Sequence, residues 1–486
     1  MLNRGLPNSV ARIWSRAGQA ALNARFSSWA HWRHQKYASA QDVPASQRLW
    51  LGVKRCLVYL PLEVLAAPLP TFSNYGVRLG ARLQPLQSPA AIEKTGFLEA
   101  SEKVTRWLSL SGIQDRSENP DLHGSVHAWF DPTSRDYAFP YPEITGYFMT
   151  WALYHCALAE NHGEDGEPFR EMARQAARWQ SSHGMLRGVG GVWNRPPIWV
   201  KDHPQKEGPF LYTFDTAMAM TGMVNLYRFT GDEKMLDVAE EMLHFLQEMA
   251  RPDGFFNARF DVATHRTVDS DRHWSSTAGC WETKLALPLL LYSECKKTRT
   301  AEDAARAICD HVLKLQSGEG TFSMDNKSDF VYSHETCYAA EGLAVMGLRT
   351  GQPRYLKAAL RATQALLSHQ LPAGGIPRMM TGLAPQDTES SDVLAQVLRL
   401  GALFRARREL GDEDTRKLHA LARRIHNYQN RSEIVSEDGG MEYGIDLAGN
   451  RKAHLNGWAS MFSDQAYAAW GGLVDPIQLF TSGLLV

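Results

Sequence analysis

The sequence lacks several features that would indicate a function directly. It contains neither a GxGxxG fingerprint nor a GxxxxGK[ST] phosphate loop, so no nucleotide cofactor is expected. Its 52 basic and 53 acidic residues almost cancel, and this balance gives no reason to expect nucleic-acid binding. No uninterrupted apolar run reaches the length of about 18 residues that a membrane-spanning helix needs.

Cysteine is scarce and scattered along the chain. The six cysteines form no CxxC pair and show no regular spacing; they are Cys56, Cys156, Cys280, Cys295, Cys309 and Cys337. In a chain of 486 residues this pattern favours reduced thiols in a cytoplasmic compartment over a disulfide framework. Zinc binding by Cys280, Cys337 and His334 is an alternative, but buried structural cysteines are the favoured interpretation, so no metal is predicted.

Acidic residues are absent from residues 1–41, which instead combine arginines with Trp14, Trp29 and Trp32. This segment belongs to a basic extension, residues 1–90, that lies outside the repeat described below. One interpretation is an amphipathic segment that rests on an anionic membrane surface and makes the protein a peripheral membrane protein. The others are a basic tail packed on the rest of the protein and an organellar transit peptide.

An internal repeat of about 55 to 70 residues dominates the remaining chain. Six segments are apolar on nearly all faces and open with polar residues, as helices inside a larger structure do. They begin near Tyr141, Tyr212, Ser275, Ser333, Glu389 and Asn456. Between them lie amphipathic helices, such as those expected at 233–249, 301–316 and 353–370, followed by glycine-rich turns.

With a further helix near 91–110, the pattern gives six inner and six outer helices. We therefore predict an all-α fold, an (α/α)6 toroid of six helical hairpins, over residues 91–486. An open solenoid of helical hairpins is the alternative.

The repeat resembles the α/α toroid superfamily. This group includes six-hairpin glycosidases, sugar 2-epimerases, the C-terminal part of glucuronyl 5-epimerases, triterpene cyclases and protein prenyltransferases. The resemblance rests on repeated turns of the type Gln, then Asp-Gly-Gly-aromatic, and on helix openings such as YPEITGY. The segment from Asn456-Gly457-Trp458 to Gln465-Ala466 also resembles the closing inner helix of polysaccharide-acting members. The resemblance implies the fold but not the reaction, because toroids host many chemistries.

In such a ring the inner helices run parallel, so the polar residues that open them share one cleft. The candidate catalytic residues are Glu143, Asp215, Glu282, His334, Glu335 and Tyr338. The candidate substrate-binding residues are Tyr141, Tyr212, Arg272, His273, Trp274, Asp392, Asn456 and Trp458. Some carboxylates, Asp392 among them, have the alternative role of capping a helix.

Two chemistries fit these side chains, and both act on a polysaccharide or oligosaccharide. In glycoside hydrolysis, one carboxyl group protonates the leaving oxygen and a second activates water or attacks the anomeric carbon. In uronate 5-epimerase or lyase chemistry, a base removes the proton at carbon 5 while Arg272 holds the sugar carboxylate. The mixed Tyr, His, Arg and carboxylate set slightly favours the second.

The basic N-terminus suggests work close to a membrane, as in exopolysaccharide biosynthesis. A different class of function also fits the sequence. The protein would then be a non-catalytic glycan-binding or scaffold subunit of a polysaccharide synthesis complex.

Overall fold

The computed structural model describes residues 94–486 except for 201–209, 269–273, 324–329, 382–383, 386–387 and 447–448. The chain divides into two units, residues 1–88 and 89–486, and every described residue belongs to the second. The predicted membrane-contacting segment 1–41 and the predicted extension 1–90 therefore lie outside the described residues. None of the described helices combines the length and the hydropathy that crossing a membrane requires.

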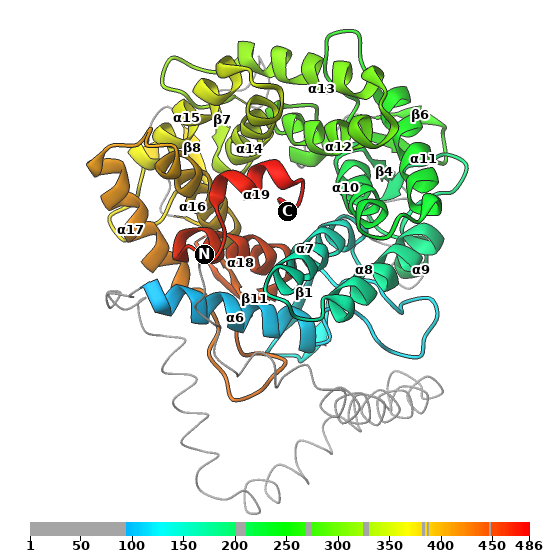
Figure 1. Cartoon of the computed structure of the whole chain (residues 1–486), viewed down its shortest axis with the longest axis horizontal. Helices are drawn as coiled ribbons and strands as arrows, with labels where there is room; N and C mark the ends of the chain where they lie inside the picture. The colour runs from blue at the N-terminus through cyan, green and yellow to red at the C-terminus, as the bar shows by residue number, and fades with distance from the viewer. Residues whose placement is uncertain are drawn as a thin grey trace, which may run out of the picture. The chain divides into compact units, whose positions relative to one another are not determined.

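The described part of the chain forms a closed double ring of helices (Figure 1). The inner ring consists of α7 (Pro142–Asn161), α10 (Thr213–Thr230), η3 with α12 (Cys280–Leu285 and Ala286–Lys296), α14 (Ser333–Thr350), α16 (Ser391–Ala406) and α18 (Gly457–Gly471). The outer ring consists of α6 (Lys94–Leu110), α8 (Glu167–Trp179), α11 (Glu233–Met249), α13 (Arg299–Val312), α15 (Pro353–Ser368) and α17 (Asp412–His426). This arrangement confirms the predicted (α/α)6 toroid.

Burial explains which helices form which ring. In α10 every residue from Thr213 to Leu226 is buried, in keeping with a sequence that is apolar on all sides. In α11 the buried residues recur three and four positions apart, so that one face packs inward and the other carries charge. A left-handed residue, Gly231 with φ of 69°, links these two helices.

The turns after the outer helices join each hairpin to the next and close the ring. Gln370, at the end of α15, donates its amide to the carbonyl of Lys417 in α17 at 2.8 Å. The equivalent Gln429, after α17, donates to the carbonyl of Ala100 in α6, also at 2.8 Å. Since α6 comes first and α17 last among the outer helices, this contact excludes an open solenoid.

Short antiparallel strands lie where the inner helices begin. In the described part of the chain, three small sheets have the orders β10-β11-β1-β2, β3-β4-β5-β6 and β7-β8-β9. Their strands are β1 (Trp129–Asp131), β2 (Asp136–Tyr137), β3 (Val192–Trp193), β4 (Phe210–Tyr212), β5 (Arg259–Asp261), β6 (Arg266–Thr267), β7 (Phe330–Tyr332), β8 (Met379–Thr381), β9 (Ala384–Pro385), β10 (Glu442–Ile445) and β11 (Arg451–Asn456). The strands β4, β7 and β11 run directly into α10, α14 and α18, so they mark one end of the ring.

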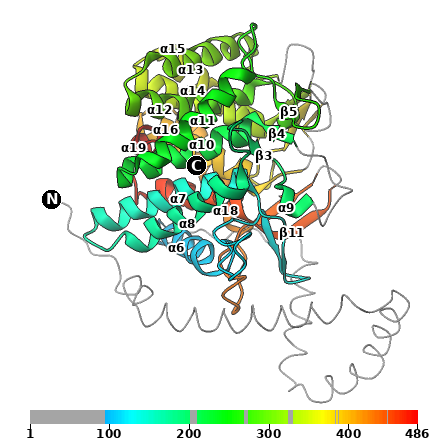
Figure 2. The same cartoon turned by 90° about the vertical axis from the view of Figure 1, so that its right-hand side faces the viewer.

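The other end of the ring is filled by α19 (Pro476–Ser482) and the residues that follow it. In Figure 2, α19 and the strands lie on opposite sides of the ring. Asn225, near the end of α10, donates to the carbonyl of Gly483 at 2.8 Å, and Gln465 of α18 donates to that of Leu484 at 2.7 Å. The helix therefore closes the end at which the inner helices finish, and the end with the strands remains as the mouth.

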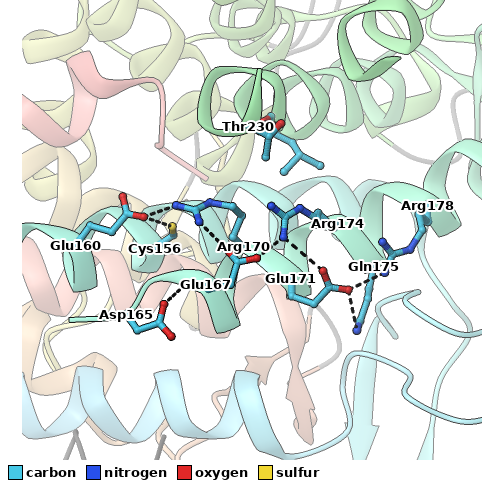
Figure 3. A network of polar contacts seen from close by, with 11 residues as sticks. Cys156, Glu160, Asp165, Glu167, Arg170, Glu171, Arg174, Gln175, Arg178 and Thr230 are labelled. Atoms are coloured by element: carbon cyan, nitrogen blue, oxygen red, sulfur yellow. Dashed lines mark hydrogen bonds and ion pairs between the residues drawn. The ribbon is translucent and has the colours of Figure 1, made fainter. Parts of the chain in front are cut away.

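Charged side chains on the outside of α8 form a ladder of ion pairs (Figure 3). Arg174 contacts both Glu167 and Glu171, and Arg178 contacts Glu171 at 2.7 Å. Glu167 and Glu171 are nearly half exposed, and exposed pairs of this kind each contribute at most about 1 kcal/mol to stability. Buried polar groups inside the ring have larger effects than these exposed pairs.

Candidate functional site

The inner helices present layers of side chains to the axis of the ring. Positions i, i+4 and i+7 lie on one face of a helix, and three helices repeat this spacing with inward-facing polar or aromatic residues. They are His334, Tyr338 and Glu341 of α14; Asp392, Gln396 and Arg399 of α16; and Trp458, Phe462 and Gln465 of α18. The first residue of each set lies in the first turn of its helix, at the mouth, and the last lies toward α19.

Two buried carboxyl groups lie in the first turns of two neighbouring inner helices, α7 and α10. Glu143 of α7 is 7% exposed and Asp215 of α10 is fully buried. Burial raises the pKa of Glu143 to about 7, although a hydrogen bond from Tyr141 and the charge of Arg195 lower it in part. Burial and the neighbouring Glu143 raise the pKa of Asp215 well above its ordinary value, against a hydrogen bond from Asn194 at 3.2 Å.

Two adjacent buried carboxylates repel each other, so they do not both ionise readily. At neutral pH the Glu143–Asp215 pair therefore retains at least one proton. Asp215 Oδ1 has no hydrogen-bond partner among the described residues, and neither has Oε2 of Glu335. Glu335 is buried as well, and burial raises its pKa to about 8. The mouth thus holds neutral carboxyl groups with unused hydrogen-bonding capacity.

A second cluster crosses the mouth from α18 to α7. Asp392 accepts a hydrogen bond from Trp458 Nε1 at 2.9 Å, and its Oδ2 lies 3.8 Å from Nδ1 of His334. The rings of His334 and Tyr338 meet edge to face at 4.3 Å. The hydroxyl of Tyr147 then donates to that of Tyr338 at 3.2 Å. Four inner helices thereby contribute to one polar and aromatic cluster.

Two arginines border these clusters. Arg195 lies over the ring of Phe139 at 3.6 Å, beside Tyr141. Arg378 donates to the hydroxyl of Tyr443 at 2.9 Å and lies 5.1 Å from the centre of that ring. Within the described residues, neither guanidinium forms an ion pair with a carboxylate. Both keep donors for an anionic ligand.

The carboxylate of Glu282 lies in a backbone turn. Its two oxygens accept hydrogen bonds from the backbone N–H groups of Phe256 at 2.8 Å and Gly279 at 3.3 Å. In other repeats a hydroxyl accepts the equivalent bond: Thr145 from Val126, Thr216 from Val192, and Ser460 from Met441. The carboxylate of Glu282 therefore stabilises the local backbone, as these hydroxyls do in the other repeats.

The remaining predicted site residues lie at the starts of helices or outside the described residues. Asn456 caps α18, with its Oδ1 accepting from the backbone of Ala459 at 2.9 Å. Tyr141 and Tyr212 precede the first turns of α7 and α10, and Tyr212 is buried. Trp274 begins a short 3-10 helix, η2 (Trp274–Ser276), while Arg272 and His273 lie outside the described residues.

Solved structures with a similar arrangement place this fold in a known group. Over 78% of this chain and 98% of its own, a sugar epimerase from a ruminal bacterium aligns with a TM-score of 0.62 at 11% identity. The unsaturated glucuronyl hydrolase of Bacillus sp. GL1, responsible for the degradation of glycosaminoglycan, aligns over 76% and 96% with a TM-score of 0.55 at 13% identity. A D-mannose isomerase aligns over 79% and 99% with a TM-score of 0.58 at 14% identity. The fold is that of the α/α toroids.

At this level of identity the likeness of the toroids concerns the fold alone. No protein-family model matches the sequence, and the search of curated proteins finds no match either. The likeness therefore assigns no particular reaction to this toroid.

Several residues of the toroid mouth were not among the sequence candidates. Tyr147 follows Glu143 by four positions on the same helix face, so the spacing rule would have found it. Asn194, Arg195 and Arg378 lie in connecting segments, where no periodicity indicates which side chains turn toward the cleft. Within the described part of the toroid, no three His, Cys, Asp or Glu side chains gather as metal ligands.

Proposed function

We propose that the chain is a carbohydrate-active enzyme and that the Glu143–Asp215 pair is its acid–base centre. The observation that carries the proposal is the burial of two adjacent carboxyl groups whose pKa values are both raised. A carboxyl group that is still protonated near pH 7 can serve as a general acid, which an ordinary exposed glutamate cannot. The toroids of similar fold include enzymes that act on sugars, which supports this class.

Hydrolysis of a glycosidic bond is the reaction that this pair supports best. The protonated carboxyl group gives its proton to the leaving oxygen as the bond to the anomeric carbon breaks. The ionised partner activates water, or attacks the anomeric carbon before water does, and the sugar gains a hydroxyl group. Glu143 and Asp215 come from neighbouring helices, so they can flank one bond from two directions.

The substrate that fits this mouth is an acidic oligosaccharide or polysaccharide. Arg195 and Arg378 carry charges that no described carboxylate neutralises by direct contact, and a uronate carboxylate is a natural partner for a guanidinium. The rings of Tyr141 and Trp458 are partly exposed and offer apolar faces to a sugar. We include Tyr141, Asp392 and Trp458 in the proposed substrate-binding set.

A uronate 5-epimerase or lyase is the second candidate, favoured by the cluster of His334, Tyr338 and Tyr147. In this reaction a base takes the proton from carbon 5, and a cation stabilises the negative charge that develops on the sugar carboxylate. His334 would be the base and Arg378 the cation. Return of a proton to the opposite face gives epimerisation, whereas loss of the leaving group gives an unsaturated end.

We leave Glu282 and Asn456 out of the proposed reacting groups, because their oxygens already accept backbone hydrogen bonds. Contact of residues 1–41 with an anionic membrane, a cytoplasmic location and a place in exopolysaccharide biosynthesis remain proposals from the sequence. Co-sedimentation of the full chain with anionic vesicles would test the first of them.

The experiment incubates the purified chain with acidic and neutral glycans in heavy water and analyses the products by mass spectrometry. Hydrolysis adds the elements of water to the products, elimination gives an unsaturated end, and epimerisation incorporates deuterium without cleavage. We expect cleavage of an acidic glycan by hydrolysis. Glu143→Gln and Asp215→Asn should each lower its rate by about 10²- to 10⁴-fold, the usual contribution of a general acid or base.

Glu282→Gln is the matched control, because it also replaces a buried glutamate at the start of an inner helix. Its folded fraction should retain activity. If no glycan is changed by the wild type but an acidic glycan binds, the alternative of a glycan-binding or scaffold subunit replaces the enzyme. Equal activity of wild type, Glu143→Gln and Asp215→Asn would remove the pair from the mechanism.

A further inference from the structure

A row of aromatic side chains crosses the sheet β10-β11-β1-β2, beside the starts of α18 and α7 (Figure 1). In the antiparallel pair β1 and β11, Trp129 lies opposite Asn456, so His454, two residues earlier, shares the face of Trp129. The centres of the Trp129 and His454 rings are 4.8 Å apart. Phe130 and Leu455 point to the other face and are buried. Trp129 and His454 are partly exposed, so the described residues do not fully cover their face of the sheet.

The row extends toward α18 through Tyr443 of β10. Its ring stacks on that of His454 at 5.4 Å, with 19° between the planes, and lies 6.0 Å from the ring of Trp458. Tyr443 is also partly exposed. Burial lowers the pKa of His454 to about 4, so this ring is uncharged at neutral pH. We call Tyr443, His454 and Trp129 the aromatic track.

Two arginines flank the aromatic track. At one end, Arg378 donates to the hydroxyl of Tyr443 at 2.9 Å. At the other end, the ring of Phe139 meets that of Trp129 edge to face at 5.5 Å, and Arg195 lies 3.6 Å from the centre of the Phe139 ring. A guanidinium has five N–H donors, more than these contacts use, so both ends of the track can bind an anionic group.

Acidic side chains beside the aromatic track make contacts within the sheet itself. Glu442 forms an ion pair with Arg451 at 2.8 Å, and Asp446 forms one with Lys452 at 3.1 Å. Asp131, at the end of β1, accepts a backbone hydrogen bond in the β1–β2 turn at 2.7 Å. The β10–β11 hairpin therefore presents little uncompensated negative charge to an acidic ligand.

These features match the chemistry of a linear polyuronate. Aromatic rings pack on the apolar faces of sugars, and guanidinium groups pair with uronate carboxylates. We propose that the aromatic track binds further units of an acidic polysaccharide, with carboxylates at Arg378 and Arg195, while one unit reaches the Glu143–Asp215 pair. The substrate is then a polymer and not a mono- or disaccharide. The acidic class of the glycan rests on the proposed function, but the track concerns binding and not the reaction.

The test measures affinities of the full chain by isothermal titration calorimetry. The ligands are uronate oligosaccharides of two to ten units, prepared from polygalacturonate, alginate and hyaluronan. We expect the affinity for at least one series to rise by about 10-fold or more between two and six units, because added units gain contacts on the aromatic track. Cellohexaose, a neutral chain of six sugars, should bind more weakly because it has no carboxylate for the arginines.

Trp129→Ala removes the ring at the centre of this contact. It should lower the affinity for six units by about 3- to 10-fold, the effect of one aromatic stacking contact, and change that for two units by less than about 2-fold. A second measurement needs no variant. In the wild type, a bound hexasaccharide should protect Trp129 and Tyr443 from hydroxyl-radical oxidation, and the disaccharide should not.

Trp470→Ala is the matched control. Trp470 lies at the end of α18 that is far from the mouth, and its ring contacts that of His419 at 4.9 Å, much as Trp129 contacts His454. The folded fraction of this variant should keep every affinity of the wild type.

The outcomes separate the aromatic track from the proposed function. Equal affinity for two and six units would overturn the inference, as would the absence of binding to all three series or a hexasaccharide that leaves Trp129 unprotected. Length-dependent binding without any reaction would support the track and contradict the proposed enzyme. Hydrolysis of an acidic disaccharide with no gain from longer chains would instead support the proposed function and contradict the track.

Discussion

The side chain of Glu143 makes stability depend on pH in a direction opposite to that of most carboxylates. Its folded-state pKa of about 7 is above the ordinary value of 4.5, so between these pH values the folded protein binds more protons than the unfolded chain. The contribution of this group to stability is therefore greatest at low pH and is lost as pH rises toward 7. Above pH 7 the buried charge of the ionised Glu143 carboxylate destabilises the folded protein.

Glu143→Gln should remove this destabilisation, because a glutamine side chain carries no charge. We expect the variant to be more stable than the wild type by about 2–3 kcal/mol at pH 8, and to show no gain at pH 4, where both side chains are neutral. Urea unfolding at the two pH values measures the difference. An equal effect at both would mean that Glu143 titrates like an exposed glutamate, and the argument for a retained proton would then fail.

The candidate site shows which residues a sequence can and cannot indicate. Glu143, Asp215, His334 and Asp392 lie in the first turns of inner helices, where helix periodicity places them; Glu143 neighbours Asp215, and His334 lies 3.8 Å from Asp392. Glu282 lies at the start of an inner segment too, but its carboxylate accepts backbone hydrogen bonds, the shorter of them from Phe256. That contact joins residues 26 positions apart, and no local pattern encodes it.

At the scale of elements, the helix pattern predicted most of the ring because apolar spacing follows the helical period. The third inner element departs from it, with a 3-10 helix over Cys280–Leu285 ahead of α12. Pro288 supplies a reason, because proline lacks the N–H that would bond to the carbonyl of Lys284 and is tolerated only in the first turn of an α-helix. The strands were missed because each has only two to six residues.

The turn between α17 and β10 packs closely against α6 at Gly439. Gly439 has φ of +94°, and a Cβ there would lie 2.2 Å from the carbonyl oxygen of Lys103 in α6. Gly439→Ala should therefore lower the free energy of unfolding by about 3–5 kcal/mol, since strain and a backbone clash add. Gly231→Ala is the control: its φ is +69°, nothing lies within 4 Å of its Cβ, and it should cost only about 1–2 kcal/mol in urea unfolding.

At the scale of the whole ring, the mouth and the end closed by α19 are different parts of one structure. The mouth contains carboxyl groups with raised pKa values, and two arginines that form no ion pair with a carboxylate of the described residues; such features cost stability and favour a ligand. At the closed end, backbone carbonyls after α19 accept hydrogen bonds from side chains of inner elements that are far apart in sequence. Lys284 and Gln465, for example, both contact the segment after α19.

A substitution of Phe480 in α19 tests whether the closed end affects stability without affecting the mouth. It is fully buried, so Phe480→Ala should leave a cavity and cost about 3–5 kcal/mol, measured by urea unfolding. Val435→Ala, at a side chain that is 48% exposed, is the surface control and should change stability by less than about 0.5 kcal/mol.

In the folded fraction of Phe480→Ala, affinity for an acidic glycan should match the wild type, because the mouth is at the opposite end. A weaker affinity would show that packing around α19 reaches the mouth, and the contacts of Gln465 with Arg399 and of Arg399 with Glu341 are the path by which it would do so.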